Sequence, residues 1–519
     1  MAALEQLYTA DGSRELDRRA IAGGVPGMEL MRRAGSAVFD TLLDGWPSLT
    51  RLSICCGKGN NAGDGYVVAR LARAQGLSVQ LVQLGDPAAL AGDAATARDE
   101  ALAQGLEISS AGDGRVELTG EVIVDALLGT GLKGAARGAY AALIDNMNGT
   151  DRPVLAVDVP SGLEADTGAA PGAAVRAHTT VTFIGRKIGL HTGAGVALAG
   201  RVRFASLGVG REIRSSVPGL DWLNFPELAD RLGLPVRTAD AYKQALGHVV
   251  VVGGDSSMGG APLMAAEAAL RSGAGLVTVV TRAAHRSAIL SRRPEVMVVD
   301  ADDAEMRDEV LAKATVLVVG PGLGRAQWGE QLLGLALSRS VPMVIDADGL
   351  YLLSQNGAHA PRDAVITPHV AEAARLLAVT VAEVNADRPA AAVALAERVA
   401  GVAVLKGAGS LVASAVDGPA RVLGICAHGN PGMATAGMGD VLAGIIGGLR
   451  GQHKNSVEAA LLGTCLHGLA ADRAVGRLGM ASLLATDIFP ELIDVLRSAE
   501  SPGSFSGSSL VGSRNQREV

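Results

Sequence analysis

The chain has 519 residues, of which 48 % are hydrophobic and 19 % charged, so it can bury large cores and most of its length is not disordered. Its net charge of −7, without a basic run interleaved with aromatic residues, argues against a nucleic-acid-binding surface. This length predicts about two to four domains.

The cysteines and the N-terminus bear on the cellular compartment. The first residues lack the apolar core of a signal peptide, and no run of about 20 apolar residues is present to span a membrane. None of the cysteines has the spacing of metal ligands, so we interpret them as buried, reduced thiols of a cytoplasmic protein. They are Cys55, Cys56, Cys426 and Cys465.

The first half of the chain alternates short apolar runs with helical patterns. Valine-rich runs of this kind indicate a parallel sheet covered on both faces, and therefore an α/β domain. The predicted strands span residues 52–56, 79–84, 122–128, 154–159 and 181–184.

A glycine-rich loop, GKGNNAGDG, follows the strand at 52–56 and precedes a helix. This is the usual place for a phosphate or dinucleotide, although the loop is not the strict dinucleotide fingerprint and such turns are often purely structural. Its two amides, Asn60 and Asn61, and the carboxylate of Asp64 offer groups that can coordinate a cation or orient a sugar.

Two more carboxylates follow predicted strands. Asp125 ends the strand in VIVDALLGTGLKG, and Asp158 ends the strand in VLAVDVPSGL. Carboxylates at the carboxyl ends of parallel strands point into the ligand crevice, whereas either one alone can be a helix cap. Because these loops and the glycine loop share one edge of the sheet, we expect a site there.

The regular pattern lapses between residues 208 and 243, which predicts a domain boundary. We assign residues 1–215 to the first domain, 216–235 to a linker and 236–498 to the second domain. The Ser/Gly-rich tail at 499–519 is predicted to be disordered. The second domain repeats the α/β pattern, with predicted strands at 248–252, 276–280, 296–299, 316–319, 343–346, 365–367 and 402–405.

Residues 429–449, GNPGMATAGMGDVLAGIIGGL, place Asp440 where a glycine-rich turn becomes an apolar helix. Backbone N–H groups at such a turn suit a phosphate. A carboxylate there repels phosphate unless it positions, or takes a proton from, a hydroxyl that meets the phosphorus. The alternative is an ordinary N-capping aspartate.

The motifs GKGNNAGDGYVVARLA, VDALLGTGL and AVDVPSGL, in this order, resemble the NAD(P)H-hydrate epimerase family over about residues 1–210. The resemblance implies a Rossmann-like three-layer fold and a potassium ion held by Asn61, Asp125 and Ser161. It implies Asp158 as a catalytic residue. The implied substrate contacts are Asn60, Asn61, Ala62, Gly63, Asp64, Gly129, Thr130, Gly131, Leu132, Lys133, Gly134, Ala135 and Asp158.

The motifs VVGPGLGR, VIDADGLYLL, ITPHVAEAARLL, VLKGAGS and NPGMATAGMGD resemble the ribokinase-like ADP/ATP-dependent NAD(P)H-hydrate dehydratases. Without this pattern, His369 would be interpreted as a satisfied histidine after a strand and Lys406 as a solvated loop lysine. The resemblance implies Asp440 as a catalytic residue, with Mg²⁺ accompanying ADP. The implied substrate contacts are Ala261, Gly322, His369 and Asp440, and the implied nucleotide contacts are Lys406, Gly407, Ala408, Gly409, Ser410 and Gly439.

Together the halves resemble the bifunctional NAD(P)H-hydrate repair enzymes. This implies epimerisation of R and S hydrates of NADH and NADPH, then dehydration of the S form with ADP through a phosphorylated intermediate. A homo-oligomer is expected. Two alternatives stay open: a ribokinase-superfamily small-molecule kinase, which leaves the NNAGDG domain unexplained, and a catalytically weakened nucleotide-sensing scaffold.

Some positions depart from the family pattern and place substrate affinity and rate in question. Ala62 and Ala436 replace glycines, Gln244 follows Lys243 where a glycine is usual, and Val370-Ala371 replaces Pro-Gly. A methyl group at position 62 is expected to narrow the first pocket, if its backbone suits an L-residue.

Overall fold

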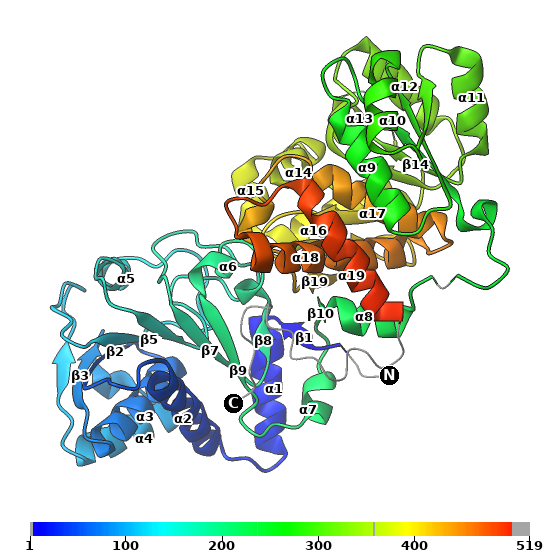
Figure 1. Ribbon diagram of the computed structural model, residues 1–519. Coiled ribbons are helices and arrows are strands. Elements are labelled where there is room, and N and C mark those ends of the chain that lie inside the picture. The colour runs from blue at the N-terminus through cyan, green and yellow to red at the C-terminus, as the bar shows by residue number, and fades with distance from the viewer. Residues whose placement is uncertain (1–3, 236, 356–358, 501–519) are drawn as a thin grey trace. The chain divides into compact units, whose positions relative to one another are not determined.

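The computed structural model describes residues 4–235, 237–355 and 359–500 (Figure 1). The chain divides into two compact units. One comprises residues 6–220, and the other comprises residues 221–500 together with Leu4 and Glu5. The predicted tail therefore lies almost wholly outside the described residues. No described helix is long and apolar enough to cross a membrane, and all four cysteines are free and buried.

A seven-stranded parallel sheet, in the order β4-β3-β2-β5-β6-β7-β9, forms the centre of the first unit. Its strands are β2 (Arg51–Cys56), β3 (Ser78–Gln83), β4 (Ile108–Ser110), β5 (Val122–Ala126), β6 (Val154–Val157), β7 (Thr179–Phe183) and β9 (Arg201–Ala205). A short parallel pairing joins β1 (Gln6–Tyr8) to β8 (Arg186–Lys187).

Helices cover both faces of this sheet because successive strand residues point to opposite sides. Ile54 and Val124 join one core with the helices α2, α3 and α4, while Cys55 and Ile123 join a second core with α5. The predicted three-layer arrangement is confirmed. The helices of the unit are α1 (Ala10–Ala22), α2 (Gly27–Gly45), α3 (Asn60–Ala74), α4 (Gly92–Ala103), α5 (Ala139–Asn148), α6 (Gly195–Leu198) and α7 (Arg211–Ser215).

The second unit holds a larger sheet with the order β13-β12-β11-β14-β15-β16-β17-β18-β19-β10. Its pairs are parallel except those of β18 with β17 and with β19. The strands are β10 (Leu220–Leu223), β11 (His248–Val252), β12 (Leu276–Thr281), β13 (Met297–Asp300), β14 (Val316–Val319), β15 (Met343–Ile345), β16 (Val365–Ile366), β17 (Val402–Leu405), β18 (Leu411–Ser414) and β19 (Arg421–Cys426).

The longest apolar helices of the second unit pack on this sheet and on one another. A Cβ atom at Gly444 would clash with the carbonyl oxygen of Ala265, so glycine lets α17 approach the backbone of α9. The helices are α8 (Phe225–Leu232), α9 (Gly260–Arg271), α10 (Arg286–Arg292), α11 (Ala304–Lys313), α12 (Gln327–Leu337), α13 (Ala347–Gln355), α14 (Val370–Leu377), α15 (Val381–Ala386), α16 (Arg388–Val399), α17 (Met438–Gly451), α18 (Ser456–Leu478) and α19 (Ile488–Glu500).

The segment predicted as the linker, residues 216–235, contains β10 and α8. Phe225 and Leu228 are buried in the core of the second unit, and β10 pairs with β19. This segment therefore belongs to the second unit instead of forming an irregular linker. Its single strand and helix carry too little periodicity for the sequence to reveal this.

Candidate active sites

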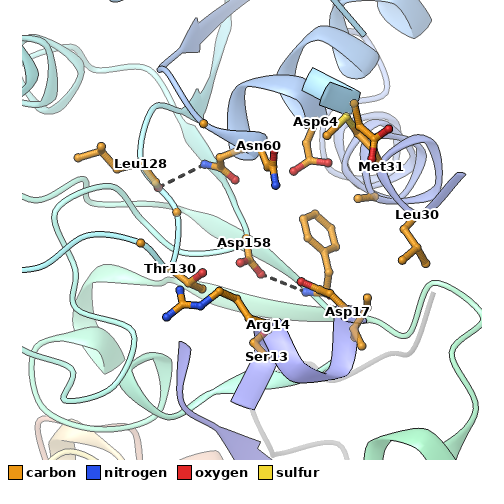
Figure 2. A pocket seen from close by; sticks show the side chains of 18 of the residues that line it. Ser13, Arg14, Asp17, Leu30, Met31, Asn60, Asp64, Leu128, Thr130 and Asp158 are labelled. Atoms are coloured by element: carbon orange, nitrogen blue, oxygen red, sulfur yellow. Dashed lines mark hydrogen bonds between the residues drawn. The ribbon is translucent and has the colours of Figure 1, made fainter. Parts of the chain in front are cut away.

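A cavity of about 590 Å³ opens in the first unit beside the carboxyl ends of its parallel strands (Figure 2). Its walls come from α1, α2, the start of α3 and the loops that follow β5 and β6. Of the predicted epimerase residues, those that line it are Asn60, Asn61, Asp64, Gly129, Thr130, Gly131, Leu132, Lys133 and Asp158.

The other predicted contacts, Ala62, Gly63, Gly134 and Ala135, are not among the lining residues. The reason for the first two is that α3 already begins at Asn60, so residues 62 and 63 turn into the core. Ala62 is fully buried there on helical backbone. Its backbone suits an L-residue, but its methyl group does not line the cavity, contrary to the expectation that it narrows the pocket.

Asp158 is held by a lysine that the sequence did not single out. Lys187 Nζ lies 2.5 Å from Asp158 Oδ1, and Thr182 Oγ1 donates to the same oxygen at 3.1 Å. Lys187 is almost fully buried and is placed by the short pairing of β8 with β1. Asp158 itself has a left-handed backbone with φ of 64°, which a non-glycine residue keeps only when its surroundings hold it there.

Two further carboxyl groups that line the cavity, those of Asp17 and Asp64, have raised pKa values (Figure 2). Burial raises the pKa of Asp17 on α1 to about 6; the attraction of Lys187 opposes the rise and the repulsion of Asp158 adds to it. Burial also raises the pKa of Asp64 well above its ordinary value, and repulsion by Asp158 and Asp17 adds to the shift. Asp17 was missed because nothing in an amphipathic helix marks one polar residue as facing a cavity.

The three residues predicted to hold potassium come together at the edge of the cavity, where Asn61 is one of the lining residues. Ser161 Oγ and N donate to the two oxygens of Asp125 at 2.6 and 2.8 Å, and Asn61 Nδ2 donates to the carbonyl oxygen of Leu128 at 3.2 Å. Asp125 is fully buried, and burial raises its pKa to about 6, although the hydrogen bonds from Ser161 oppose the shift. A buried carboxylate among hard oxygen donors fits an alkali or other hard cation rather than a soft metal.

In the second unit, Asp440 lies in the first turn of α17, just after the glycine-rich turn. The N-cap is Gly437, with φ of 92°, and no side chain caps the helix, so the alternative of an N-capping Asp440 is wrong. Ala436 is not among the non-glycine residues with positive φ, so its methyl group causes no backbone strain.

Asp440 shares its surroundings with Asp346 and Lys406. Lys406 Nζ lies 2.7 Å from Asp346 Oδ1. A Cβ atom at Gly439 would lie 3.1 Å from both Lys406 Nζ and Asp346 Oδ2, so the backbone before Asp440 passes directly over this pair. Burial, reinforced by Asp346 and only partly offset by Lys406, raises the pKa of Asp440 to about 7.

Lys406 is not a solvated loop lysine. Its ammonium is mostly buried, and although burial lowers its pKa, the charges of Asp346 and Glu372 produce a net rise. Arg388 Nη2, beneath the loop, donates to the carbonyl oxygen of Lys406 at 3.3 Å. The rest of the predicted nucleotide-binding loop, Gly407, Ala408, Gly409 and Ser410, connects β17 to β18, with φ of 135° at Gly407 and 65° at Gly409.

The residues predicted to contact the dehydratase substrate form two groups, Gly322 with Ala261 and, separately, His369 at the start of α14. Gly322 lies against Ala261, since a Cβ atom at position 322 would be 3.2 Å from the Cβ of Ala261. His369 caps α14: its Nδ1 accepts from the N–H groups of Ala371 and Glu372 at 3.1 and 3.3 Å. Burial and the charge of Lys406 lower the pKa of His369, which favours a neutral ring within electrostatic reach of the Lys406 site. The Val370-Ala371 departure simply forms the first turn of α14.

Comparison with known proteins assigns both halves. A family described as NAD(P)H-hydrate dehydratase matches residues 249–494, and a family described as YjeF-related protein N-terminus matches residues 27–189. The bifunctional NAD(P)H-hydrate repair enzyme of Coxiella burnetii is 44 % identical, covering 94 % of this chain and 98 % of the relative. The corresponding Escherichia coli protein is 43 % identical, covering 94 % and 93 %. The chain belongs to the family of bifunctional NAD(P)H-hydrate repair enzymes.

It is therefore an enzyme with an epimerase domain and a dehydratase domain, as predicted. Among solved structures, the ADP/ATP-dependent NAD(P)H-hydrate dehydratase of Bacillus subtilis, co-crystallised with ATP and Mg²⁺, is 27 % identical with a TM-score of 0.47, covering 54 % of this chain and 99 % of that chain. A ribokinase-like superfamily protein of Enterococcus faecalis is 30 % identical with a TM-score of 0.49, covering 53 % and 95 %.

Proposed function

We propose that the first domain interconverts the R and S hydrates of NADH and NADPH at the Asp158 cavity. The second domain then dehydrates the S hydrate at the Asp440 site, consuming ADP through a phosphorylated intermediate. One observation carries the dehydratase assignment: a carboxyl with a pKa of about 7 stands beside a buried lysine, in the first turn of a helix that no side chain caps.

The dehydration chemistry explains these groups. Hydroxide is a poor leaving group and phosphate a good one, so phosphorylating the ring hydroxyl allows the double bond to re-form. Asp440 positions or deprotonates that hydroxyl, while the N–H groups of Ala436–Gly439 stabilise the charge on the transferring phosphoryl group. The Lys406–Ser410 loop binds the nucleotide, and Ala261, Gly322 and His369 contact the hydrate.

Mg²⁺ enters this proposal with the nucleotide. In the described part of the chain, no group of three or more His, Cys, Asp or Glu side chains forms a metal site. Phosphate oxygens and water would therefore complete the coordination shell, as is common for this ion.

In the epimerase domain, Asp158 provides a carboxylate whose position is fixed by Lys187. A potassium ion held by Asn61, Asp125 and Ser161 would offset the buried charge of Asp125 and fix the loop that carries Leu128. The amides of Asn60 and the loop at Gly129–Lys133 form the remaining polar wall. A cytoplasmic location and a homo-oligomeric state complete the proposal.

The direct test incubates the full chain with a mixture of R and S NADHX and monitors the absorbance of reduced nicotinamide. With ADP and Mg²⁺, both epimers should be recovered as NADH; without ADP, none should be. A stable phosphorylated product instead of NADH would favour a small-molecule kinase, and no turnover in either half would favour the scaffold alternative.

A further inference from the structure

Helix α1 supplies one wall of the epimerase cavity. Its N-cap is Thr9, whose Oγ1 accepts from Gly12 N at 3.0 Å, and the helix is anchored in the core by Leu16 and Ala20. Ser13, Arg14, Asp17 and Ile21, spaced as one helix face, line the cavity. The position of Asp17 is therefore set by a capped, anchored helix.

Three of the carboxyl groups that line this cavity, those of Asp17, Asp64 and Asp158, interact with the same ammonium group, that of Lys187. Lys187 pairs with Asp158, and both residues act electrostatically on Asp17 and on Asp64. The other charged side chains that line the cavity are Arg14, Lys58, Asp93 and Lys133. Because Lys187 can neutralise only one of three adjacent carboxylates, the cluster retains protons at a pH where isolated carboxyls are ionised.

Epimerisation needs two proton-transfer groups. Water adds to the dihydronicotinamide ring with its oxygen on the carbon next to the ring nitrogen, because nitrogen stabilises positive charge there. To invert that carbon, a base removes the hydroxyl proton, and the carbon–nitrogen bond breaks as the aldehyde C=O forms. The electron pair goes to the ring nitrogen, which takes a proton from an acid. After the aldehyde rotates, nitrogen attacks its other face and both protons return.

We propose that Asp17 is the second proton-transferring residue of the epimerase, acting on the ring nitrogen from a different wall of the cavity than Asp158. This inference rests on the proposed epimerase function. Asp158, paired with Lys187, is suited to be the base that takes the hydroxyl proton. Asp17 gives its proton during ring opening and recovers it during closure, so no proton, electron or water is consumed.

Asp17 is better suited to this task than Asp64. Asp17 lies half-buried on the cavity wall, and its pKa of about 6 allows it to gain and lose a proton near neutral pH. Burial raises the pKa of Asp64 well above its ordinary value, which favours the protonated carboxyl and disfavours a cycle of proton release and uptake.

The test uses full-length Asp17→Asn and Asp17→Glu with R-NADHX and no ADP, and follows the appearance of the S epimer by chromatography. The Asn variant should lose about a hundredfold or more in kcat, with KM within about threefold. The wild-type rate should fall as pH rises above about 6, because Asp17 loses its proton. The rate of the Asn variant should not fall in this pH range. The Glu variant should recover part of the rate, and its rate should fall over a different pH range.

Glu15→Gln is the matched control, since Glu15 lies on the same helix and neither it nor its partners Arg18 and Arg19 line the cavity. ADP-dependent dehydration of S-NADHX and the melting temperature report whether each variant is folded. If Asp17→Asn keeps the wild-type rate and pH profile while Asp158→Asn is inactive, the role of Asp17 is overturned and the epimerase function stands. If the wild type does not exchange the epimers at all, the proposed function fails.

Discussion

At the scale of single residues, the raised pKa of Asp440 predicts how both the dehydration rate and the stability of the domain change with pH. If ionised Asp440 accepts the hydroxyl proton, dehydration should slow as pH falls below about 7. Folding raises this pKa, so the folded domain should lose stability as pH rises from about 4 to 7. Asp440→Asn should therefore melt at a higher temperature than wild type at pH 8, with a difference that shrinks at acid pH.

The same Asn variant should lower the ADP-dependent rate at least about a hundredfold, as expected for loss of a general base. Rate measurements and thermal melts between pH 5 and pH 8 check both effects. A full rate in the variant would show that Asp440 does not act on the hydroxyl.

Ala436 tests whether the phosphate-binding turn is damaged. Its φ is not positive, and Gly437 takes the left-handed conformation instead. Ala436→Gly should therefore leave the rate unchanged and lower stability by about 0.4–1 kcal/mol, because glycine increases the entropy of the unfolded chain. Melting temperature and ADP-dependent rate are measured together. A tenfold gain in rate, about 1.4 kcal/mol in the barrier, would contradict this interpretation.

At the scale of elements, the loops after β5 and β6 meet the start of α3 at the predicted potassium site. The buried Asp125 carboxylate should be stabilised by the ion, so epimerase activity or melting temperature should be higher in potassium than in a bulky organic cation at equal ionic strength. Asp125→Asn removes the charge and is the matched control. If potassium raises the activity or melting temperature of this variant as much as that of the wild type, potassium does not bind at Asp125.

The sequence predicted the elements with strong apolar periodicity and missed those without it. The central strands β2, β5 and β11 were found to within a residue or two, since short apolar runs that lead into glycine-containing loops give a clear signal. The antiparallel strands β18 and β19 were not predicted. In the first site, Asp158 was found at a strand end, but Lys187 and Asp17 were not, because their roles depend on packing between elements distant in sequence.

At the scale of the whole molecule, the two candidate sites lie in separate compact units, each with its own core. The two activities should therefore be separable. Asp440→Asn should abolish ADP-dependent recovery of NADH while epimer exchange persists. Asp158→Asn should allow repair of the S hydrate but not of the R hydrate, beyond its slow spontaneous epimerisation.

Asparagine is preferred to alanine at position 158, because its amide oxygen can still accept from the buried Lys187 ammonium, whereas alanine would leave that ammonium only its bond to the carbonyl oxygen of Phe183. Both reactions are measured on each variant, with R and S hydrates supplied separately. If one folded variant loses both activities, the epimerase and dehydratase activities are not separable as predicted.

Because α17 approaches α9 closely at Gly444, the helix that carries the dehydratase residue Asp440 is part of the rigid core of its domain. One helix carries Asp440 in its first turn and packs backbone against backbone one turn later. Its amides from Val441 to Ile446 are buried in the core and should exchange with solvent hydrogen only when the domain unfolds. Heating should therefore abolish dehydratase turnover and tertiary structure at the same temperature. Activity should not be lost earlier through local unfolding of the active site.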